Sequence, residues 1–355
     1  ESRRRVDVNQ KISAVVAELR ELENRAQQGA LDDADAWFMA SQTIERAATL
    51  SQNDLADPDL LVKVNEAVAD FKVAGEDREL ILRLETIRNE FSGLAARGDR
   101  AWAVSGAHAE MPEYRTVFSE YGIPPVITKP EHAAKRITGT SPRAHEALEV
   151  ALWVWWGYYS YINGDLSEER KAEHAWVGEV LDALETDPWR RRLIDSPREL
   201  SVWIELADDE TALGRQPPHS LLVLATGFLS NAEYRKRGIE VLKQAQRHYP
   251  MDYWVNRALS ENIRRPPQAL RYASIAATLR PSDPEPRLRI AQALDSMRKP
   301  EDALAVYQDS LLLGAEPAVV HRMIGKLHAR QGDMDRAINA YRAAVAVTSI
   351  PDPHT

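Results

Sequence analysis

Residues 324–344 read IGKLHARQGDMDRAINAYRAA, and this stretch decides the fold. Its small residues, Gly325 and Ala337, allow two neighbouring helices to approach each other closely. Tyr341 follows four positions after Ala337 and is large enough to fill the gap to a following helix pair. The stretch therefore predicts two helices packed against each other.

The same pattern occurs earlier in the chain, at residues 290–307, which read IAQALDSMRKPEDALAVY. Ala303 follows Ala269 by 34 residues, and Ala337 follows Ala303 by the same interval. This is the period of the tetratricopeptide repeat, in which each unit is one pair of helices. The residues of this predicted packing signature are Ala269, Ala291, Ala303, Tyr307, Gly325, Ala337 and Tyr341.

Residues 215–355 are predicted to hold four such units. A proline is expected to end each second helix, at Pro250 and Pro281 and, two residues late, at Pro317 and Pro351. The second unit is short, because Ala269 follows Gly238 by only 31 residues, and its helices are expected to cross at an unusual angle. The helix pairs predicted for the first two units are 221–229 with 238–249 and 253–263 with 269–279.

The remainder of the chain is also predicted to be helical. Residues 1–105 are expected to form helical hairpins or a short coiled coil, including a long helix with a weak point at Gly75. Residues 106–141 are rich in Gly and Pro and are predicted to be a hinge that holds a short helix at 114–121. Residues 142–214 are predicted to form helix pairs, among them 168–184 and 197–213, as degenerate repeats. The predicted fold class is thus all-α, a right-handed α-solenoid preceded by helical hairpins.

The composition restricts the classes of function. The 355 residues carry a formal net charge of -9, which argues against a general nucleic-acid binder. With no Cys, the chain has no disulfide, thiolate nucleophile or Cys-based metal site. Its longest uncharged stretch, 150–164, is shorter than the roughly 20 residues that cross a bilayer, so no membrane insertion is expected. Because the chain starts at Glu1 without a signal peptide, it is interpreted as a soluble portion of a longer protein.

The sequence lacks the motifs of the common enzyme classes. A kinase needs a glycine-rich loop, a His-Arg-Asp loop and an Asp-Phe-Gly motif, and the sequence has none of them. We therefore expect no catalytic residue, no cofactor and no bound metal. His321 and His328 share a helix face, but His328 occupies an interior repeat position, which favours packing over metal binding. A hydrolase assembled from scattered residues is a remote alternative.

Aromatic residues concentrate in the helix that follows Pro142. The cluster comprises Trp153, Trp155, Trp156, Tyr158, Tyr159 and Tyr161. Aromatics this dense on one helix usually bury area against neighbouring helices. A core is therefore favoured over an aromatic ligand platform.

Basic residues suggest a binding surface. Arg322, Lys326 and Arg330 recur every four residues on the first helix of the last unit, whose exposed face would line the groove of the solenoid. Two interpretations stay open, a solvated basic face without a partner and a groove for an acidic peptide or protein segment. The residues of the predicted groove are Arg257, Arg264, Arg265, Arg322, Lys326 and Arg330. Binding of a protein partner is the expected function, and homodimerisation through residues 6–91 is the alternative.

Several short motifs resemble the C-terminal region of planctomycete-type transmembrane serine/threonine protein kinases. They are DPWR at 187–190, Pro217-Pro218, and AQRHYPMDYWVN at 245–256, with LRLETIR at 82–88 and residues 114–123 fitting further upstream. In that family a kinase domain precedes one membrane helix, a coiled helical segment and repeats. The resemblance implies that this chain is the sensory or partner-binding part of a bacterial signalling kinase.

The resemblance also bears on the side of the membrane. The family topology favours repeats outside the cytoplasm. The cluster Arg3-Arg4-Arg5, however, is typical of the cytoplasmic end of a membrane helix. The sequence leaves the two sides open.

Overall fold

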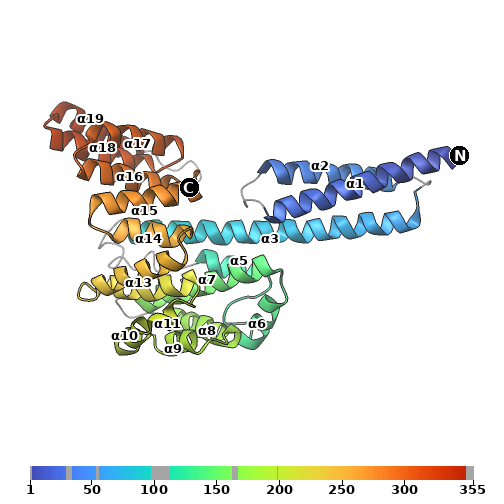
Figure 1. Ribbon diagram of the computed structural model, residues 1–355, viewed down its shortest axis with the longest axis horizontal. Helices are drawn as coiled ribbons and strands as arrows, with labels where there is room; N and C mark the ends of the chain where they lie inside the picture. The colour runs from blue at the N-terminus through green and yellow to red at the C-terminus, as the bar shows by residue number, and fades with distance from the viewer. Residues whose placement is uncertain are drawn as a thin grey trace. The chain divides into compact units, whose positions relative to one another are not determined.

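The computed structural model describes residues 2–28, 34–52, 56–96, 112–161, 167–197 and 199–348. Every regular element among them is an α-helix, as the sequence predicts (Figure 1). The chain divides into two compact units, one formed by residues 1–90 and 111–151 and the other by residues 91–110 and 152–355. None of the described helices combines the length and the apolar character needed to cross a bilayer.

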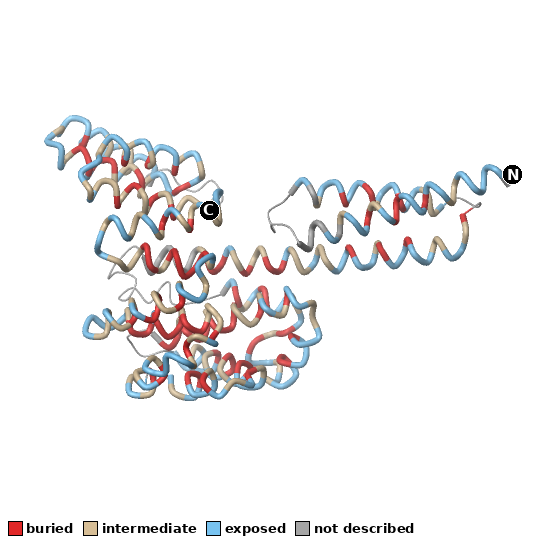
Figure 2. The backbone as a smooth tube through the Cα atoms, in the orientation of Figure 1, coloured by how far each residue is buried: buried red, intermediate tan, exposed pale blue. Residues whose placement is uncertain are grey.

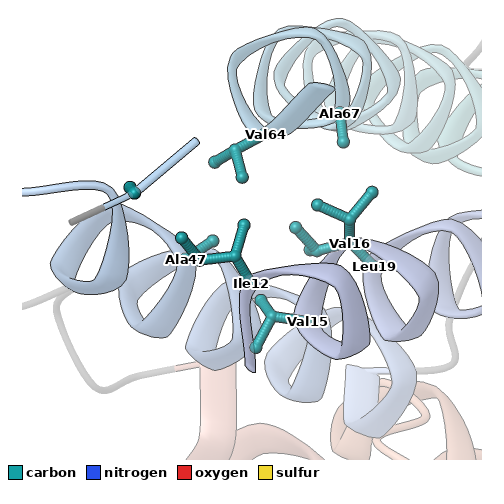
Figure 3. Packing of buried hydrophobic residues seen from close by; sticks show 8 residues of the cluster. Ile12, Val15, Val16, Leu19, Ala47, Val64 and Ala67 are labelled. Carbon is teal, nitrogen blue, oxygen red and sulfur yellow. The ribbon is translucent and has the colours of Figure 1, made fainter. Parts of the chain in front are cut away.

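The first unit begins with three long helices, α1 (Ser2–Gln28), α2 (Ala34–Ser51) and α3 (Pro58–Ala96). Apolar side chains at helical spacing on all three helices meet in one core (Figure 3). The predicted hairpin is therefore present, and α3 continues unbroken through Gly75. The buried residues of this core are Ile12, Val15, Val16, Leu19, Ala47, Ala56, Val64 and Ala67.

The start of α3 follows from its local sequence. Pro58 occupies the first helical position, where a missing N–H costs nothing. The Asp57 carboxylate accepts a hydrogen bond from the backbone N–H of Asp59 at 3.0 Å, and the N–H of Asp57 donates to the side chain of Asn9 on α1 at 3.0 Å. The turn before α3 is thus capped and tied to α1.

The described part of the predicted hinge is packed. It holds two helices, α5 (Pro112–Glu120) and α6 (Pro130–Thr138), where the sequence predicted one. Tyr114, Phe118 and Ile137 from these helices are fully buried. Residues 112–141 therefore contribute to the core of the first unit, and residues 106–111 lie outside the described residues.

The second unit starts within α7 (Pro142–Tyr161) and continues through α8 (Glu168–Leu184), α9 (Pro188–Asp195), α10 (Leu200–Asp208) and α11 (Glu210–Leu213). The prediction of a single helix at 197–213 is wrong, because the helix is interrupted at Asp209. The Asp209 side chain accepts a hydrogen bond from the N–H of Ala212 at 2.9 Å and so caps a new helix.

Four helix pairs follow in the described residues (Figure 1). Within each pair the two helices pack against each other, and α15 also packs against α16. The pairs are α12 (Pro218–Ser230) with α13 (Arg235–His248), α14 (Tyr253–Asn262) with α15 (Pro266–Leu279), α16 (Pro284–Ser296) with α17 (Pro300–Leu312), and α18 (Pro317–Gln331) with α19 (Met334–Thr348).

The prolines act differently from the prediction. Pro250 and Pro281 do follow the ends of α13 and α15. Pro317, however, begins α18, where its fixed φ and missing N–H suit the first helical position. The other prolines at this position in the repeats are Pro218, Pro266, Pro284 and Pro300.

Small residues bring the paired helices close together. The fourth position of the second helix holds Gly238 in the first pair and alanine in the other three. A Cβ added to Gly238 would lie 2.8 Å from the backbone oxygen of Ala225, so the two helices leave no room for a side chain there. Ala303 and Ala337 at the same position are buried, whereas Ala269 is half-buried. Along these helices, buried residues on the packed side alternate with exposed residues on the other side (Figure 2).

The two signature tyrosines differ. Tyr307 is buried in a cluster with Val320 and Ile324 of the next unit, so it fills the gap between these two units. Tyr341 instead lies over Gly325 of its own unit, where an added Cβ would come within 2.7 Å of its ring. The prediction that Tyr341 fills a gap to a following unit is therefore wrong for the described residues.

Candidate binding surface

The first helices of the repeats form the candidate surface. In a helical solenoid these helices face the inner side of the superhelix. α14 packs against both α12 and α16. Side chains on this face therefore come from successive units.

A buried network of charged and polar groups centres on Arg257 of α14. Its side chain is only 2% exposed, and its Nε donates to the Glu261 carboxylate at 3.1 Å, one helical turn away. Its Nη1 donates to the Tyr253 hydroxyl at 3.3 Å. That hydroxyl donates in turn to Asp283 at 2.5 Å, in the turn that precedes α16. The network thus joins the second unit to the third.

Two aromatic rings cover this network. The Arg257 guanidinium lies 5.5 Å from the ring centroid of Trp254. Arg280 lies over both Tyr253, at 4.2 Å, and Trp254, at 5.1 Å. Cations placed over aromatic faces at these distances gain electrostatic attraction from the ring.

Burial and the neighbouring charges shift the pKa values of the groups in the network. Burial raises the pKa of the Glu285 carboxyl, and Arg257 and Arg289 oppose that rise. Burial lowers the pKa of Arg257, but the neighbouring carboxylates, led by Glu261, more than offset this and hold the guanidinium in its charged form. Burial also raises the pKa of the Tyr253 hydroxyl, which stays protonated and able to donate.

Arg257 is therefore not an exposed groove cation. The sequence placed it among the peptide-binding residues, but the structure encloses it between Trp254 and Glu261. A ligand would have to displace an internal carboxylate to reach it. Its observed contacts make it a residue that joins repeats.

The basic face of α18 is exposed. Arg322, Lys326 and Arg330 lie on one side of the helix, and all three are exposed. Arg330 forms an ion pair with Asp295 of α16, whose side chain is only 11% exposed. Burial raises the pKa of Asp295, and Arg330 opposes the rise. Arg330 is therefore held by the protein, while Arg322 and Lys326 extend into solvent.

Arg264 and Arg265 occupy a different place. Both are exposed in the turn between α14 and α15, where the carbonyl oxygen of Arg265 accepts hydrogen bonds from the first turn of α15. They belong to the second unit, whereas the basic face of α18 belongs to the fourth. The exposed residues of the predicted groove thus form two separate sets, Arg264 and Arg265 on the second unit and the basic face of α18 on the fourth.

The carboxylates that balance these cations were not predicted from the sequence. They are Glu261, Asp283, Glu285 and Asp295. Glu261 was detectable, because it follows Arg257 by four positions, the spacing of a helical ion pair. Asp295 was also detectable, because it precedes Arg330 by 35 residues, close to one repeat, on neighbouring first helices.

The other candidate residues belong to the core. Trp153, Trp155, Trp156 and Tyr159 are almost fully buried, which confirms the core interpretation of the aromatic cluster. The Tyr159 hydroxyl donates to a buried Glu173 at 2.9 Å. The side chain of Tyr161 lies outside the described residues.

His328 is also buried, in agreement with the packing interpretation. Within the described ranges no cluster of three or more metal-ligating side chains occurs. The pair His321 and His328 therefore gains no further ligand there.

Two of the motifs that resemble the kinase family contain aspartates that cap helices. Asp187 caps α9 through the N–H groups of Trp189 and Arg190, at 2.9 and 3.1 Å. Arg190 in turn pairs with the buried Glu185 at 2.5 Å. The motif at 245–256 acts similarly, since its Asp252 caps α14 by accepting a hydrogen bond from the N–H of Val255 at 2.8 Å. These motifs thus set helix ends.

No family model matches the chain. Similar solved structures include MamA 41-end from Desulfovibrio magneticus RS-1, at 17% identity and a TM-score of 0.40, covering 47% of this chain and 98% of that one. Another is MamA AMB-1, at 18% identity and a TM-score of 0.38, covering 46% of this chain and 98% of that one. Similarity at this level identifies neither a ligand nor a partner.

Proposed function

We propose that this chain is a non-catalytic protein-binding scaffold whose last repeat binds an acidic peptide segment along α18. The observation that supports this most is the pair Arg322 and Lys326, exposed one helical turn apart on a first helix. An extended acidic segment would place successive carboxylates against the two cations. Side-chain packing along the first helices would supply the remaining contacts.

The charges around α18 favour a short, weakly held segment. Arg330 is already paired with Asp295, so fewer of its N–H donors are available to a ligand. Each exposed ion pair contributes only about 0.2–1 kcal/mol. Binding should therefore depend on several such contacts and should weaken as salt shortens the Debye length from ~10 Å at 0.1 M to ~3 Å at 1 M.

Fluorescence anisotropy with labelled short peptides rich in Asp and Glu would test the proposal. The double variant Arg322→Glu/Lys326→Glu should lose binding while keeping its thermal stability, because both side chains are exposed. The matched control is Lys236→Glu/Arg271→Glu, which makes the same change in net charge on second helices. Equal loss in both variants, or binding that is insensitive to salt, would contradict a site on α18.

The cellular context is a separate proposal, that the chain forms the partner-binding region of a receptor-like serine/threonine kinase. It rests on the motifs at 187–190, 217–218 and 245–256. Sequencing the gene upstream of the codon for Glu1 would test it. A kinase domain followed by one membrane helix is the expected result, and a different upstream domain would refute it.

The alternative function is dimerisation through residues 6–91. Exposed apolar side chains in this region favour it, since Phe38 is 61% exposed on α2 and Val62 and Val73 are 55% and 56% exposed on α3. If this is the main interface, the double variant Phe38→Glu/Val62→Glu should be monomeric where the parent is dimeric. Analytical ultracentrifugation would measure the difference.

A further inference from the structure

The last helix, α19, carries an apolar stripe on its exposed side. Met334 is 58% exposed, Ile338 47% and Tyr341 37%. Intervals of four and three residues place these side chains on one face of the helix. Val345, four residues further, extends the stripe and is 63% exposed.

The repeat itself indicates what such a stripe does. One repeat earlier, on α17, the equivalent positions are Leu304, Tyr307 and Leu311. These side chains pack in a cluster with residues of the following helix, α18. The stripe on α19 therefore has the form of a packing surface between units.

Charged residues along the edge of the stripe indicate the partner. Asp335 follows Met334, and Arg342 follows Tyr341, so the two charges lie on the same edge, two helical turns apart. Both are exposed, and neither forms an ion pair within the described part of the chain. A second α19 lying antiparallel across the stripe would place its Arg342 opposite Asp335, and its Asp335 opposite Arg342. The same surface on both copies thus forms two equivalent ion pairs, related by a two-fold axis.

We propose that two copies of this chain associate through α19 in this antiparallel arrangement. Met334 and Ile338 would pack near Val345 and Tyr341 of the other copy, and the two ion pairs would fix the direction. One helix face is a small interface, so the dimer should form in a concentration-dependent way.

Sedimentation velocity of the whole chain over a concentration series tests the proposal. The parent should shift from monomer to dimer as its concentration rises. Ile338→Glu and Met334→Glu should each raise the dissociation constant by at least about tenfold, because they place a carboxylate in an apolar contact. Circular dichroism melting should stay unchanged, because both side chains are exposed.

A charge reversal gives the sharper test, because it separates this arrangement from general hydrophobic association. Asp335→Arg should weaken the dimer by about tenfold, since it faces Arg342 of the other copy at both contacts, and Arg342→Asp should do the same. The double variant Asp335→Arg/Arg342→Asp should restore the parent's dissociation constant to within about threefold. A parent that stays monomeric, a double variant as weak as the single ones, or loss of the dimer only in Phe38→Glu/Val62→Glu would overturn the proposal.

Discussion

Replacing Arg257 by Met removes a buried positive charge and keeps most of the aliphatic stem. The guanidinium pairs with Glu261 at 3.1 Å, donates a hydrogen bond to the Tyr253 hydroxyl at 3.3 Å and lies over Trp254. Each of these groups is placed where it cannot be fully rehydrated. The variant therefore leaves a carboxylate without its cation inside the junction of two repeats.

The expected loss is large for one substitution. Removing one partner of a buried ion pair costs about 3–5 kcal/mol, because the remaining charge stays uncompensated. Glu261 is 13% exposed and can recover some hydration, so the lower end of this range is expected. Arg271→Met, at an exposed position on α15, is the control and should change stability by no more than about 0.5 kcal/mol.

The loss should depend on pH. Because burial raises the pKa of Glu285 in the folded state, ionising this residue costs stability as the pH rises through that pKa. Arg257 reduces the cost by lowering the pKa, so without it the pKa rises further. The difference in stability between the parent and Arg257→Met should therefore be largest at neutral pH. It should shrink as acid protonates Glu285.

Urea denaturation at neutral and mildly acidic pH, combined with hydrogen exchange of the α14 amides, measures both effects. The second substitution in Arg257→Met/Glu261→Gln should recover about 1 kcal/mol or more, because it removes the stranded charge. A loss below about 1 kcal/mol, or a loss that is the same at both pH values, would refute the account of Arg257 as a buried cation that joins repeats.

Two further predictions concern the small residues between paired helices. Gly238→Ala should destabilise the protein by about 1–3 kcal/mol, because its new Cβ would lie 2.8 Å from the backbone oxygen of Ala225. Gly325→Ala should cost less, since its nearest contact is the partly exposed ring of Tyr341, which can move more easily than a backbone oxygen. Ala337→Leu should also cost about 1–3 kcal/mol by overpacking, because Ala337 is buried against α18. Urea denaturation measures all three, and equal effects of the two glycine variants or no effect of Ala337→Leu would contradict these contacts.

The repeats were predictable because Ala269, Ala303 and Ala337 recur at an interval of 34 residues, and Gly238 precedes Ala269 by a similar interval of 31. A small residue at the fourth position of each second helix meets its paired helix through local spacing alone. The packing of residues 112–141 was not predictable in this way. Tyr114 is buried close to Glu85 and Arg88 of α3, and no local pattern in a Gly- and Pro-rich segment indicates that burial.

The candidate surface was predictable only in part. The shared helix face of Arg322 and Lys326 followed from their spacing on a first helix, and both are exposed. The burial of Arg257 did not, because Asp283 and Arg280 reach its neighbours from a turn beyond the next helix. A basic side chain at helical spacing therefore indicates a shared face, whereas its exposure depends on what the next repeat places over it.

The same dependence explains the different environments of Tyr307 and Tyr341, which occupy one repeat position and are 1% and 37% exposed. α18 covers Tyr307, whereas none of the described helices follows α19 to cover Tyr341. The proposed peptide site and dimer surface then lie on different helices of one unit, and they should respond to different substitutions. Arg322→Glu/Lys326→Glu should leave dimerisation unchanged, and Ile338→Glu should leave peptide binding unchanged. Loss of both activities in either variant would mean that the last unit has unfolded or that the two surfaces are one.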